Sequence, residues 1–453
     1  MKKLFAGLGC LAGIGLCLAG SPQTAAANEG YSPNLKGQDT EKWILNFQEE
    51  FDEESLDPSK FSDVYLPHWS NPELVKANYS IGDGKIRLLI DQFQPGWMEN
   101  TNQQISSIQT GMKDGLHIWD SSLGITGHTP AVDNYATKYG YFELRAKAQK
   151  GGGIHSAWWM IGTQNQYDKS AEVDIFEILG KDIHSEESKV WVTLHPWYDT
   201  VMRTQRLDYW VDKDISEDYH TYGFEWMPDG MKWYFDGELV RQTNQSPDYS
   251  MYTLLGIYQS WGGALSWQGA VDENQLYPKS FDIDYFRVYK TQEMLDQEAQ
   301  EEQEKAELAK RELAVEAIFG GDFTWDWYHQ PGHLNDQDMG TTLQSQDGVT
   351  FPVHLYVDWK EPKTINGMSL YTTYGMGQGI TDFFVEYQDI TDGSWKEAAK
   401  VENYQWQSNS AELEENRVAF SEPIETTAVR IKVLNANLQW GHFAMNEVKF
   451  WNH

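Results

Sequence analysis

The chain has 453 residues, of which 68 are acidic and 35 basic, and its formal net charge is -33 at pH 7. Contacts with nucleic-acid phosphates need clustered Lys and Arg, so this composition excludes nucleic acid as a partner. The length is typical of two or three domains, and an aromatic content of 14% supplies ample material for their cores.

The N-terminal segment has the pattern of a signal peptide. Met1–Lys3 is a short basic start, and the apolar stretch that follows, Leu4–Ala19, is too short and too rich in glycine to span a membrane. The small residues Ala25–Ala27 suit a signal peptidase, so we expect a signal peptide over residues 1–27, cleavage after Ala27 and secretion. No later stretch is apolar for long enough to insert into a membrane.

Both cysteines, Cys10 and Cys17, lie inside this segment. The mature chain therefore has no thiol for a disulfide, a metal site or a nucleophile. Its stability has to come from core packing.

Short runs of alternating polar and apolar residues, separated by Gly, Pro, Asn and Asp, fill residues 43–290. Glu143 and Arg145, for example, share one face of an expected strand, while Phe142 and Leu144 share the other. No long helical periodicity interrupts this pattern, which predicts an antiparallel β-sandwich.

The composition changes abruptly at Gln292, where Glu, Gln, Lys, Ala and Leu run to about Ala314 without Gly or Pro. The pattern predicts a helix over residues 292–314, with oppositely charged pairs such as Glu301 and Lys305 four positions apart. Its apolar residues are sparse and form no heptad seam. We therefore expect a semi-rigid spacer of about 30 Å in a monomer rather than a coiled-coil dimer.

The short-strand pattern returns over residues 315–453, for instance at Ala428–Leu434. It predicts a second, smaller β-sandwich, and no internal repeat links this region to the first one. The expected fold class is therefore all-β, with a charged helical linker between two sandwiches.

Three carboxylates fall within one expected strand, Ala171–Ile178, at Glu172, Asp174 and Glu177. Glu172 and Asp174 share a face of such a strand, but strict alternation would place Glu177 on the opposite face. A single β-bulge at Ile175–Phe176 would return Glu177 to the face of the other two. All three carboxylates would then line one cleft.

Carboxyl groups in this arrangement can perform acid and nucleophilic chemistry. Two of them about 5–5.5 Å apart can cleave a glycosidic bond with retention, one attacking the anomeric carbon and the other protonating the leaving oxygen. Because like charges so close cannot both ionise easily, one of them retains a proton and can act as the acid. Asp174 is placed to hydrogen-bond the nucleophile and orient it. The alternative is a solvated edge strand whose acidic residues only discourage aggregation.

The triplet also matches the bulged Glu-x-Asp-x-x-Glu motif of glycoside hydrolase family 16, which the chain resembles over about residues 43–290. Further family-like stretches occur in the expected order at Phe47–Asp52, Tyr139–Lys147, Trp158–Met160, His220–Gly237 and Asp284–Tyr289. The resemblance implies a curved jelly-roll sandwich with an open cleft and endo-acting, retaining hydrolysis of β-glycosidic bonds in a polysaccharide, with no cofactor for catalysis. It also implies that Glu172 is the nucleophile, Asp174 its assistant and Glu177 the acid/base.

Two stretches depart from the laminarin-cleaving members of that family. Ala171 stands where many of them carry Gly, and Gly152–Ala157 stands where they carry a Trp-Pro-Ala stretch, which puts a β-1,3-glucan substrate in doubt. The stretch His155–Trp159 is more similar to the endo-β-galactosidase members, so we expect a β-galactoside substrate, with an endo-β-1,3-glucanase as the alternative. An alternative of another class is a non-catalytic carbohydrate-binding surface protein. The intact pair Glu172 and Glu177 argues against it.

Aromatic and polar side chains near the triplet are candidates for binding the sugar. His195 and Trp197 share one face of the expected strand Val190–Trp197, although a structural His and a core Trp fit the pattern equally well. Trp158 and Trp159 must point to opposite faces, and we assign Trp159 to the cleft. The full set of expected substrate-binding residues is Trp159, His195, Trp197, Glu143, Arg145, Trp261 and Trp267.

Glu143 and Arg145 have two interpretations. They are either cleft residues or an ordinary solvated pair on a strand.

No Cys or His cluster has the spacing of a zinc site. The resemblance implies a structural calcium held by an Asp in the final strand, and Asp284 matches that position.

The region from residue 315 to 453 resembles discoidin-like domains of the coagulation factor 5/8 C-terminal type, which are similar to galactose-binding carbohydrate-binding modules. The resemblance is carried by Ile365–Leu370, Phe384–Tyr387, Asp392–Trp395, Ala428–Val433 and Gly441–Val448. It implies sugar binding through exposed aromatic residues, for which the candidates are Trp325, Trp327, Tyr328, Trp406 and Trp440. We place Trp395 in the core. The alternative is a domain that only packs or spaces.

Overall fold

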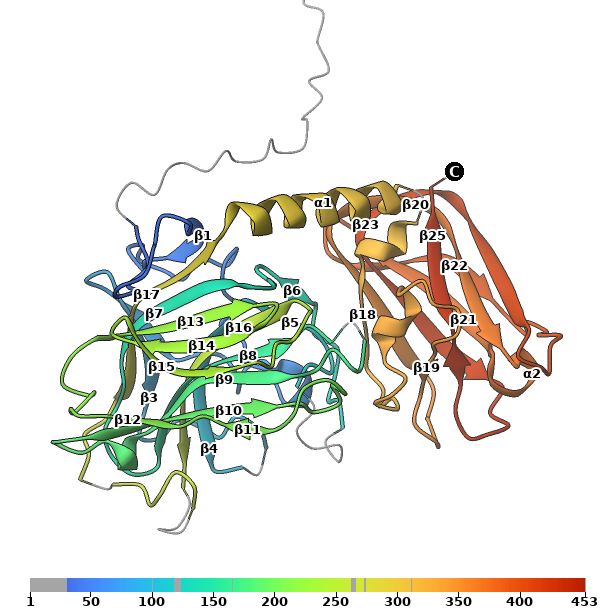
Figure 1. Cartoon of the computed structure of the whole chain (residues 1–453). Coiled ribbons are helices and arrows are strands. Elements are labelled where there is room, and N and C mark those ends of the chain that lie inside the picture. Colours follow the sequence, from blue (N-terminus) through green and yellow to red (C-terminus); the bar gives the residue numbers. More distant parts are fainter. Residues whose placement is uncertain are drawn as a thin grey trace, which may run out of the picture.

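The computed structural model describes residues 31–99, 101–117, 124–164, 166–261, 266–272, 274–310 and 312–452. The expected signal peptide, residues 1–27, lies outside the described residues. The described chain forms two β-sandwich units joined by one long helix (Figure 1). The all-β fold class expected from the sequence is confirmed.

Two antiparallel sheets build the first unit. The eight-stranded sheet has the order β15 (Glu238–Thr243), β14 (Gly230–Phe235), β13 (His220–Met227), β7 (Gly140–Lys147), β17 (Lys279–Lys290), β3 (Ile86–Ile90) and β2 (Tyr79–Ile81), with β1 (Ile44–Glu49) on β17. The seven-stranded sheet has the order β11 (Gln205–Arg206), β10 (Ser188–His195), β9 (Glu172–Leu179), β8 (Ile154–Gly162), β16 (Met251–Ser260) and β4 (Gln103–Gln109), with β12 (Tyr209–Val211) on β10. Shorter elements are β5 (Gly111–Met112), β6 (Val132–Asp133), η1 (Pro67–Trp69) and η2 (Gly180–Asp182).

The core of this unit follows from the alternation of the sequence. On β7, Phe142 and Leu144 are fully buried in an apolar cluster that also contains Val173 of β9. Glu143 and Arg145 point to the other face of the same strand. One face of each sheet thus packs into the common core, and the other face makes contacts outside that core.

The second unit is built around two long strands. Its main sheet has the order β18 (Ile318–Gly321), β20 (Val353–Thr373), β23 (Leu413–Ala436), β21 (Ile380–Gln388) and β22 (Trp395–Val401), with β25 (Glu447–Trp451) on β20. Shorter elements are β19 (Leu343–Gln344), β24 (Ala444–Met445), η4 (Pro331–Leu334) and α2 (Gly375–Gln378).

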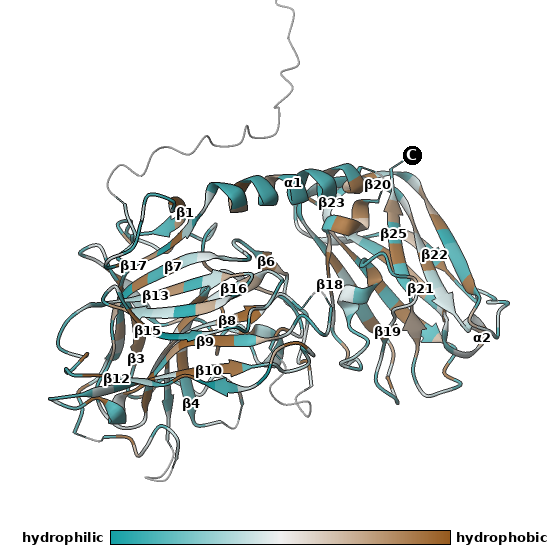
Figure 2. Cartoon of the chain, viewed as in Figure 1, coloured by the Kyte–Doolittle hydropathy of each residue, from teal (hydrophilic) through white to brown (hydrophobic). Residues whose placement is uncertain are grey.

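Helix α1 (Gln292–Ala309) follows β17 directly and is mostly hydrophilic, as Figure 2 shows. Thr291 caps its start by accepting a hydrogen bond from the backbone N–H of Met294. The helix ends at Ala309 rather than at the expected Ala314, and the 3₁₀ helix η3 (Leu313–Glu316) comes next. No described helix is long and apolar enough to cross a membrane.

Side chains of α1 fasten the helix to the first unit. Glu298 accepts a hydrogen bond from the buried ammonium group of Lys290, which also donates to the hydroxyl of Thr137 at 2.5 Å. Further along, Glu301 lies 3.5 Å from the ammonium group of Lys138. The helix is therefore bound along one side and does not stand free.

The two β units are in direct contact. Trp69 and Leu116 of the first unit share one buried apolar cluster with Phe319, Trp325 and Trp327 of the second. The rings of Trp69 and Trp327 are 5.6 Å apart. Helix α1, which the sequence predicts to be a semi-rigid spacer, is therefore not the only link between the two sandwiches, because apolar side chains of both units bury one another.

Candidate active site

A β-bulge in β9 brings three carboxylates to one side of the strand. Two consecutive residues of β8 pair with Phe176 and Asp174, so that Ile175 is the extra residue. Glu172, Asp174 and Glu177 consequently all line one cavity of about 310 Å³. The expected bulge is confirmed, and it is the reason that Glu177 faces the same space as Glu172.

Each carboxylate of this triplet lies beside one histidine. The nearest nitrogen to oxygen distances are 3.5 Å for His117 and Glu172, 3.4 Å for His195 and Asp174, and 3.4 Å for His155 and Glu177. Within the described part of the chain, the only group of His, Cys, Asp and Glu close enough to share a metal ion is Glu172, Asp174 and His195, whose ligand atoms lie within 4.8 Å of one another. That group is part of the candidate active site itself.

Protonation within the triplet follows from burial and from mutual repulsion. Burial, followed by the charge of Asp174, raises the pKa of Glu172 well above its usual range. Burial, followed by the charge of Glu177, raises the pKa of Asp174 in the same direction. Glu172 and Asp174 therefore keep one proton between them near neutral pH. The indole N–H of Trp197 donates to Glu172 at 2.8 Å, which favours the ionised form of Glu172, whereas the hydrogen bond that Glu172 shares with Asp174 raises the pKa of Glu172 and lowers that of Asp174.

Aromatic rings form much of the cavity wall. Trp159 lines the cavity from β8, and its indole N–H donates to the hydroxyl of Tyr258 at 3.0 Å. Trp267 lies half exposed at the edge, with its ring centroid 4.8 Å from that of His155. Trp261 is also half exposed but does not line this cavity. The structure thus brings Trp159 and Trp267 to the triplet and leaves Trp261 further out.

His195 and Trp197 stand beside the triplet at the end of β10. Their rings are stacked at an angle of 21° with centroids 5.6 Å apart. His195 contacts Asp174, and Trp197 contacts Glu172. Both expected residues therefore contact the triplet, although neither lines the cavity of about 310 Å³.

Several cavity residues were not predicted from the sequence, among them Tyr65, His117 and Tyr258. His117 arrives from the loop after β5 with a positive φ of 64°, for which a histidine gives no local signal. Tyr258 has a weak signal, because a Cβ at Gly256 would lie only 2.7 Å from its hydroxyl. The absence of a side chain at Gly256 makes room for the ring.

Comparison with known families agrees with this geometry. Residues 92–285 match the family model Glycosyl hydrolases family 16, and residues 323–448 match the F5/8 type C domain. The chain carries a family 16 glycoside hydrolase domain. Both resemblances stated from the sequence are confirmed.

Relatives of the family 16 domain include enzymes named for glucans. A beta-glucanase of Acetivibrio thermocellus is 31% identical over 152 residues, covering 33% of this chain and 42% of that protein. Glucan endo-1,3-beta-glucosidase A1 of Niallia circulans is 26% identical over 286 residues, covering 55% of this chain and 38% of that protein. The chain thus spans less than half the length of either relative.

A similar solved structure covers both β units. It is a GlcNAcα1-4Gal releasing endo-β-galactosidase from Clostridium perfringens, with a TM-score of 0.51 and 22% identity over 85% of this chain and 98% of that one. The likeness extends the shared fold beyond the family 16 domain.

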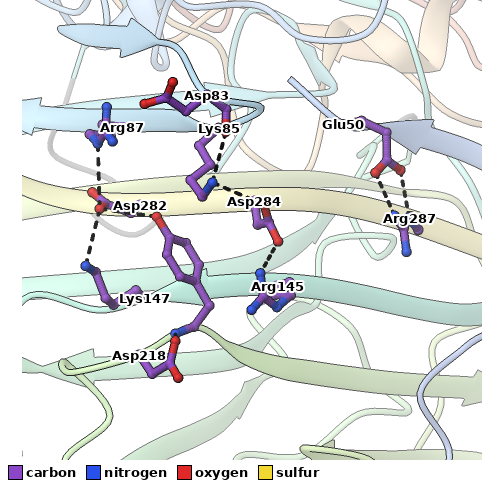
Figure 3. A network of polar contacts seen from close by, with 11 residues as sticks. Glu50, Asp83, Lys85, Arg87, Arg145, Lys147, Asp218, Asp282, Asp284 and Arg287 are labelled. Carbon is purple, nitrogen blue, oxygen red and sulfur yellow. Dashed lines mark hydrogen bonds and ion pairs between the residues drawn. The ribbon is translucent and has the colours of Figure 1, made fainter. Parts of the chain in front are cut away.

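Glu143 and Arg145 lie elsewhere, on β7 in the eight-stranded sheet. Glu143 is buried and accepts hydrogen bonds from the hydroxyl of Tyr285 at 2.8 Å and from the backbone N–H of Asn34 at 2.7 Å. Arg145 pairs with Asp284 on the neighbouring strand (Figure 3). The expectation that the two residues line the cleft is wrong, because their strand belongs to the sheet that does not carry the triplet.

Asp284 has cationic partners already. Besides Arg145, the ammonium group of Lys85 lies 3.9 Å from its carboxylate, as Figure 3 shows. A calcium site needs several uncommitted oxygen ligands, whereas this carboxylate is held between two positive charges. These residues do not fit the implied structural calcium.

The F5/8 type C domain buries most of its candidate sugar-binding aromatics. Trp325, Trp327 and Trp406 are 2%, 7% and 5% exposed, so the expectation that they bind sugar from the surface is wrong. Tyr328 and Trp440 remain 53% and 43% exposed. The ring of Trp440 packs edge-on against the half-exposed Tyr374, with centroids 5.8 Å apart. Trp395 is only partly buried rather than in the core, and the guanidinium group of Arg430 covers its ring.

Proposed function

We propose that the chain is a secreted, endo-acting, retaining glycoside hydrolase that cleaves internal β-glycosidic bonds of a polysaccharide. The observation that carries the proposal is the bulged strand β9, which turns Glu172 and Glu177 into one cavity. Retaining hydrolysis needs two such carboxyl groups, one to attack and one to donate a proton. A protein that only binds sugar has no use for a buried cluster of mutually repelling acids.

In the proposed reaction, Glu172 attacks the anomeric carbon while Glu177 donates its proton to the leaving oxygen. The resulting glycosyl ester on Glu172 is then attacked by water, and Glu177 takes up the proton of that water. The N–H of Trp197 supports the ionised form of Glu172. Asp174 lines the same cavity beside Glu172 and orients the nucleophile.

For the substrate we propose β-galactoside bonds first. The stretch that departs from laminarin-cleaving members places His155 in the cavity, beside Glu177 and between the rings of Trp267 and Tyr258. A galactose ring has an axial hydroxyl on one face and an apolar patch on the other, so it suits a site with a polar group next to an exposed aromatic ring such as that of Trp267.

A β-1,3-glucan is the second candidate. Two relatives from Niallia circulans and Cryptopygus antarcticus are named as glucan endo-1,3-β-glucosidases, at 26% and 27% identity. The cavity of about 310 Å³ has room for a sugar unit of either kind.

For the F5/8 type C domain we propose carbohydrate binding at the exposed pair Trp440 and Tyr374. Their edge-on contact leaves ring surface free for stacking on a sugar. The buried residues Trp325, Trp327 and Trp406 have no part in this site.

The test is to incubate the purified full chain with β-galactans and with β-1,3- and mixed-linkage glucans and to measure new reducing ends. Internal cleavage lowers polymer length before small products accumulate, and the linkage at the new reducing end identifies the substrate. Glu172→Gln and Glu177→Gln serve as matched controls that keep the shape of each side chain. A chain that releases nothing from any polymer but binds one of them would support the non-catalytic alternative.

A further inference from the structure

The F5/8 type C domain touches the loop that carries His117 into the active site. We propose that this domain is part of the catalytic machinery, because it holds residues 113–117 in the shape that places His117 against Glu172. The inference rests on the proposed hydrolase function. It assigns the domain a positioning role in addition to sugar binding.

The first contact is between Gly115 and Trp325. Gly115 has a positive φ of 77°, and a Cβ there would clash with the indole ring of Trp325. The backbone of the loop therefore lies directly on that ring. Because both the φ angle and the lack of space require glycine, this turn of the loop is shaped against the second unit.

The next residue of the loop is tied to the same interface. The carbonyl oxygen of Leu116 accepts a hydrogen bond from the indole N–H of Trp69 at 3.0 Å, and Nε2 of His68 lies 3.1 Å from it. Trp69 in turn packs on Trp327 of the second unit. Two tryptophans of the F5/8 type C domain thus support consecutive residues of the loop.

A third support lies one residue before Gly115. Asp114 is buried, and its carboxylate contacts Nδ1 of His128 at 2.6 Å. On the other side, Nε2 of His128 lies 3.5 Å from Asp358, and its ring stacks on Tyr356 with centroids 3.6 Å apart. Asp358 and Tyr356 belong to β20, so His128 joins the loop to the second unit.

At the end of the loop, His117 adopts a conformation that needs such support. Its φ of 64° is unfavourable for a residue with a side chain and persists only where the surroundings enforce it. Its ring lies 4.9 Å from Trp159 and 5.7 Å from Trp197, and Nδ1 is 3.5 Å from the carboxylate of Glu172. If the loop relaxes, the nucleophile loses this neighbour.

The first experiment compares two substitutions in the full chain, Trp325→Ala and Trp406→Ala. Both remove a buried indole from the second unit, but Trp406 packs within that unit, against Gly375 and Gly379. Hydrogen exchange without substrate should be at least about tenfold faster over residues 113–117 in Trp325→Ala and close to wild type in Trp406→Ala. Equal exchange over this loop in both variants would overturn the proposal.

The second experiment is a double-mutant cycle with His117→Ala, assayed on the shortest soluble oligosaccharide that the wild type cleaves. Trp325→Ala should lower kcat roughly tenfold to a hundredfold in the wild-type background, because the nucleophile is misplaced. In the His117→Ala background it should lower kcat by less than about threefold. Fully additive losses would show that Trp325 does not act through His117.

If Trp325→Ala does not fold, Trp325→Phe replaces it, because phenylalanine keeps a ring but lacks the indole atom that faces Gly115.

Two further outcomes separate this positioning role from the proposed hydrolase function. If the wild type cleaves no polysaccharide while exchange still separates the two variants, the proposed hydrolase function fails and the support of the loop stands. If the wild type is active and the cycle is additive, the function stands and the positioning role fails.

Discussion

The indole N–H of Trp197 donates to the carboxylate of Glu172 at 2.8 Å, from a residue held at a positive φ of 48°. The backbone turn after β10 is what aims this ring at the triplet. A donor at this place stabilises the ionised carboxylate, which is the form that a nucleophile needs.

Trp197→Phe should therefore raise the pKa of Glu172 further. The acidic limb of the profile of kcat/KM against pH should move to higher pH, and kcat near neutrality should fall roughly tenfold. Trp267→Phe is the control, because Trp267 lines the cavity and donates no hydrogen bond to the triplet in the described contacts. An unmoved acidic limb in Trp197→Phe would contradict the role given to this hydrogen bond.

Asp174→Asn should stabilise the folded protein at neutral pH. The folded pKa of Asp174 lies above the unfolded one because of burial and Glu177, so this residue costs stability as pH rises above the unfolded pKa. Below about pH 3, where Asp is protonated in both states, the gain should vanish. Melting curves between pH 3 and pH 8 measure this gain in stability, because the melting temperature should rise by about 2–4 °C for each kcal/mol.

Asp208→Asn is the control of opposite sign. Burial alone would raise the pKa of Asp208, but hydrogen bonds from Lys189, Val192 and Arg206 outweigh it and lower the pKa. Its stabilisation is present above the unfolded pKa and is lost as pH falls, so Asp208→Asn should lower the melting temperature at neutral pH. If Asp174→Asn instead lost stability at neutral pH, that result would contradict a proton shared by Glu172 and Asp174.

His128 should stabilise the contact between the units in a pH-dependent way. Burial would lower its pKa, but the hydrogen bond and charge of Asp114, together with Asp358 and Asp322, raise it. A raised pKa gives stability that is full below the unfolded pKa and is lost as pH rises through the folded one. His128→Gln should therefore lower the unfolding free energy more at pH 6.5 than at pH 9. An equal loss at both values would show that only packing on Tyr356 matters.

Trp440→Ala should weaken action on polymer and spare action on short soluble substrates. Loss of a surface contact lowers the effective concentration of the enzyme at an insoluble substrate, an effect of at most about a hundredfold. Ile390→Ala removes another exposed apolar side chain of the same domain and is the control. A substitution is preferable to deleting the domain, since deletion would also remove the support of residues 113–117. Equal activity of both variants on insoluble polymer would rule out Trp440 as a binding residue.

The carboxylate triplet is predictable because its signal is local. A strand of period two cannot place Glu172 and Glu177 on one face, so the spacing itself predicts a bulge, and the extra residue is Ile175. The same alternation predicts that His195 and Trp197 share a face of one strand, but β10 ends at His195, and the turn after it brings Trp197 beside the triplet. Local pattern and structure agree for the triplet, where one strand decides the outcome.

The remaining features depend on contacts between distant segments. Alternation assigns Glu143 and Arg145 to a polar face but cannot say which of two sheets their strand joins. His117 lines the cavity, and its loop packs against Trp325, which lies in another domain. An interface of this kind also buries Trp325 and Trp327, which the sequence alone presents as candidates for the surface.

Azide rescue tests the central assignment of Glu172 and Glu177 most directly. With an activated substrate, Glu172→Ala should recover activity with azide and release an α-glycosyl azide, because azide attacks in place of the nucleophile. Glu177→Ala should release a β-glycosyl azide, because azide attacks the glycosyl ester on Glu172. The anomeric proton coupling of each product gives the answer. The reverse pair of products would show that the two roles are exchanged, and no rescue of either variant would contradict the double-displacement mechanism at this site.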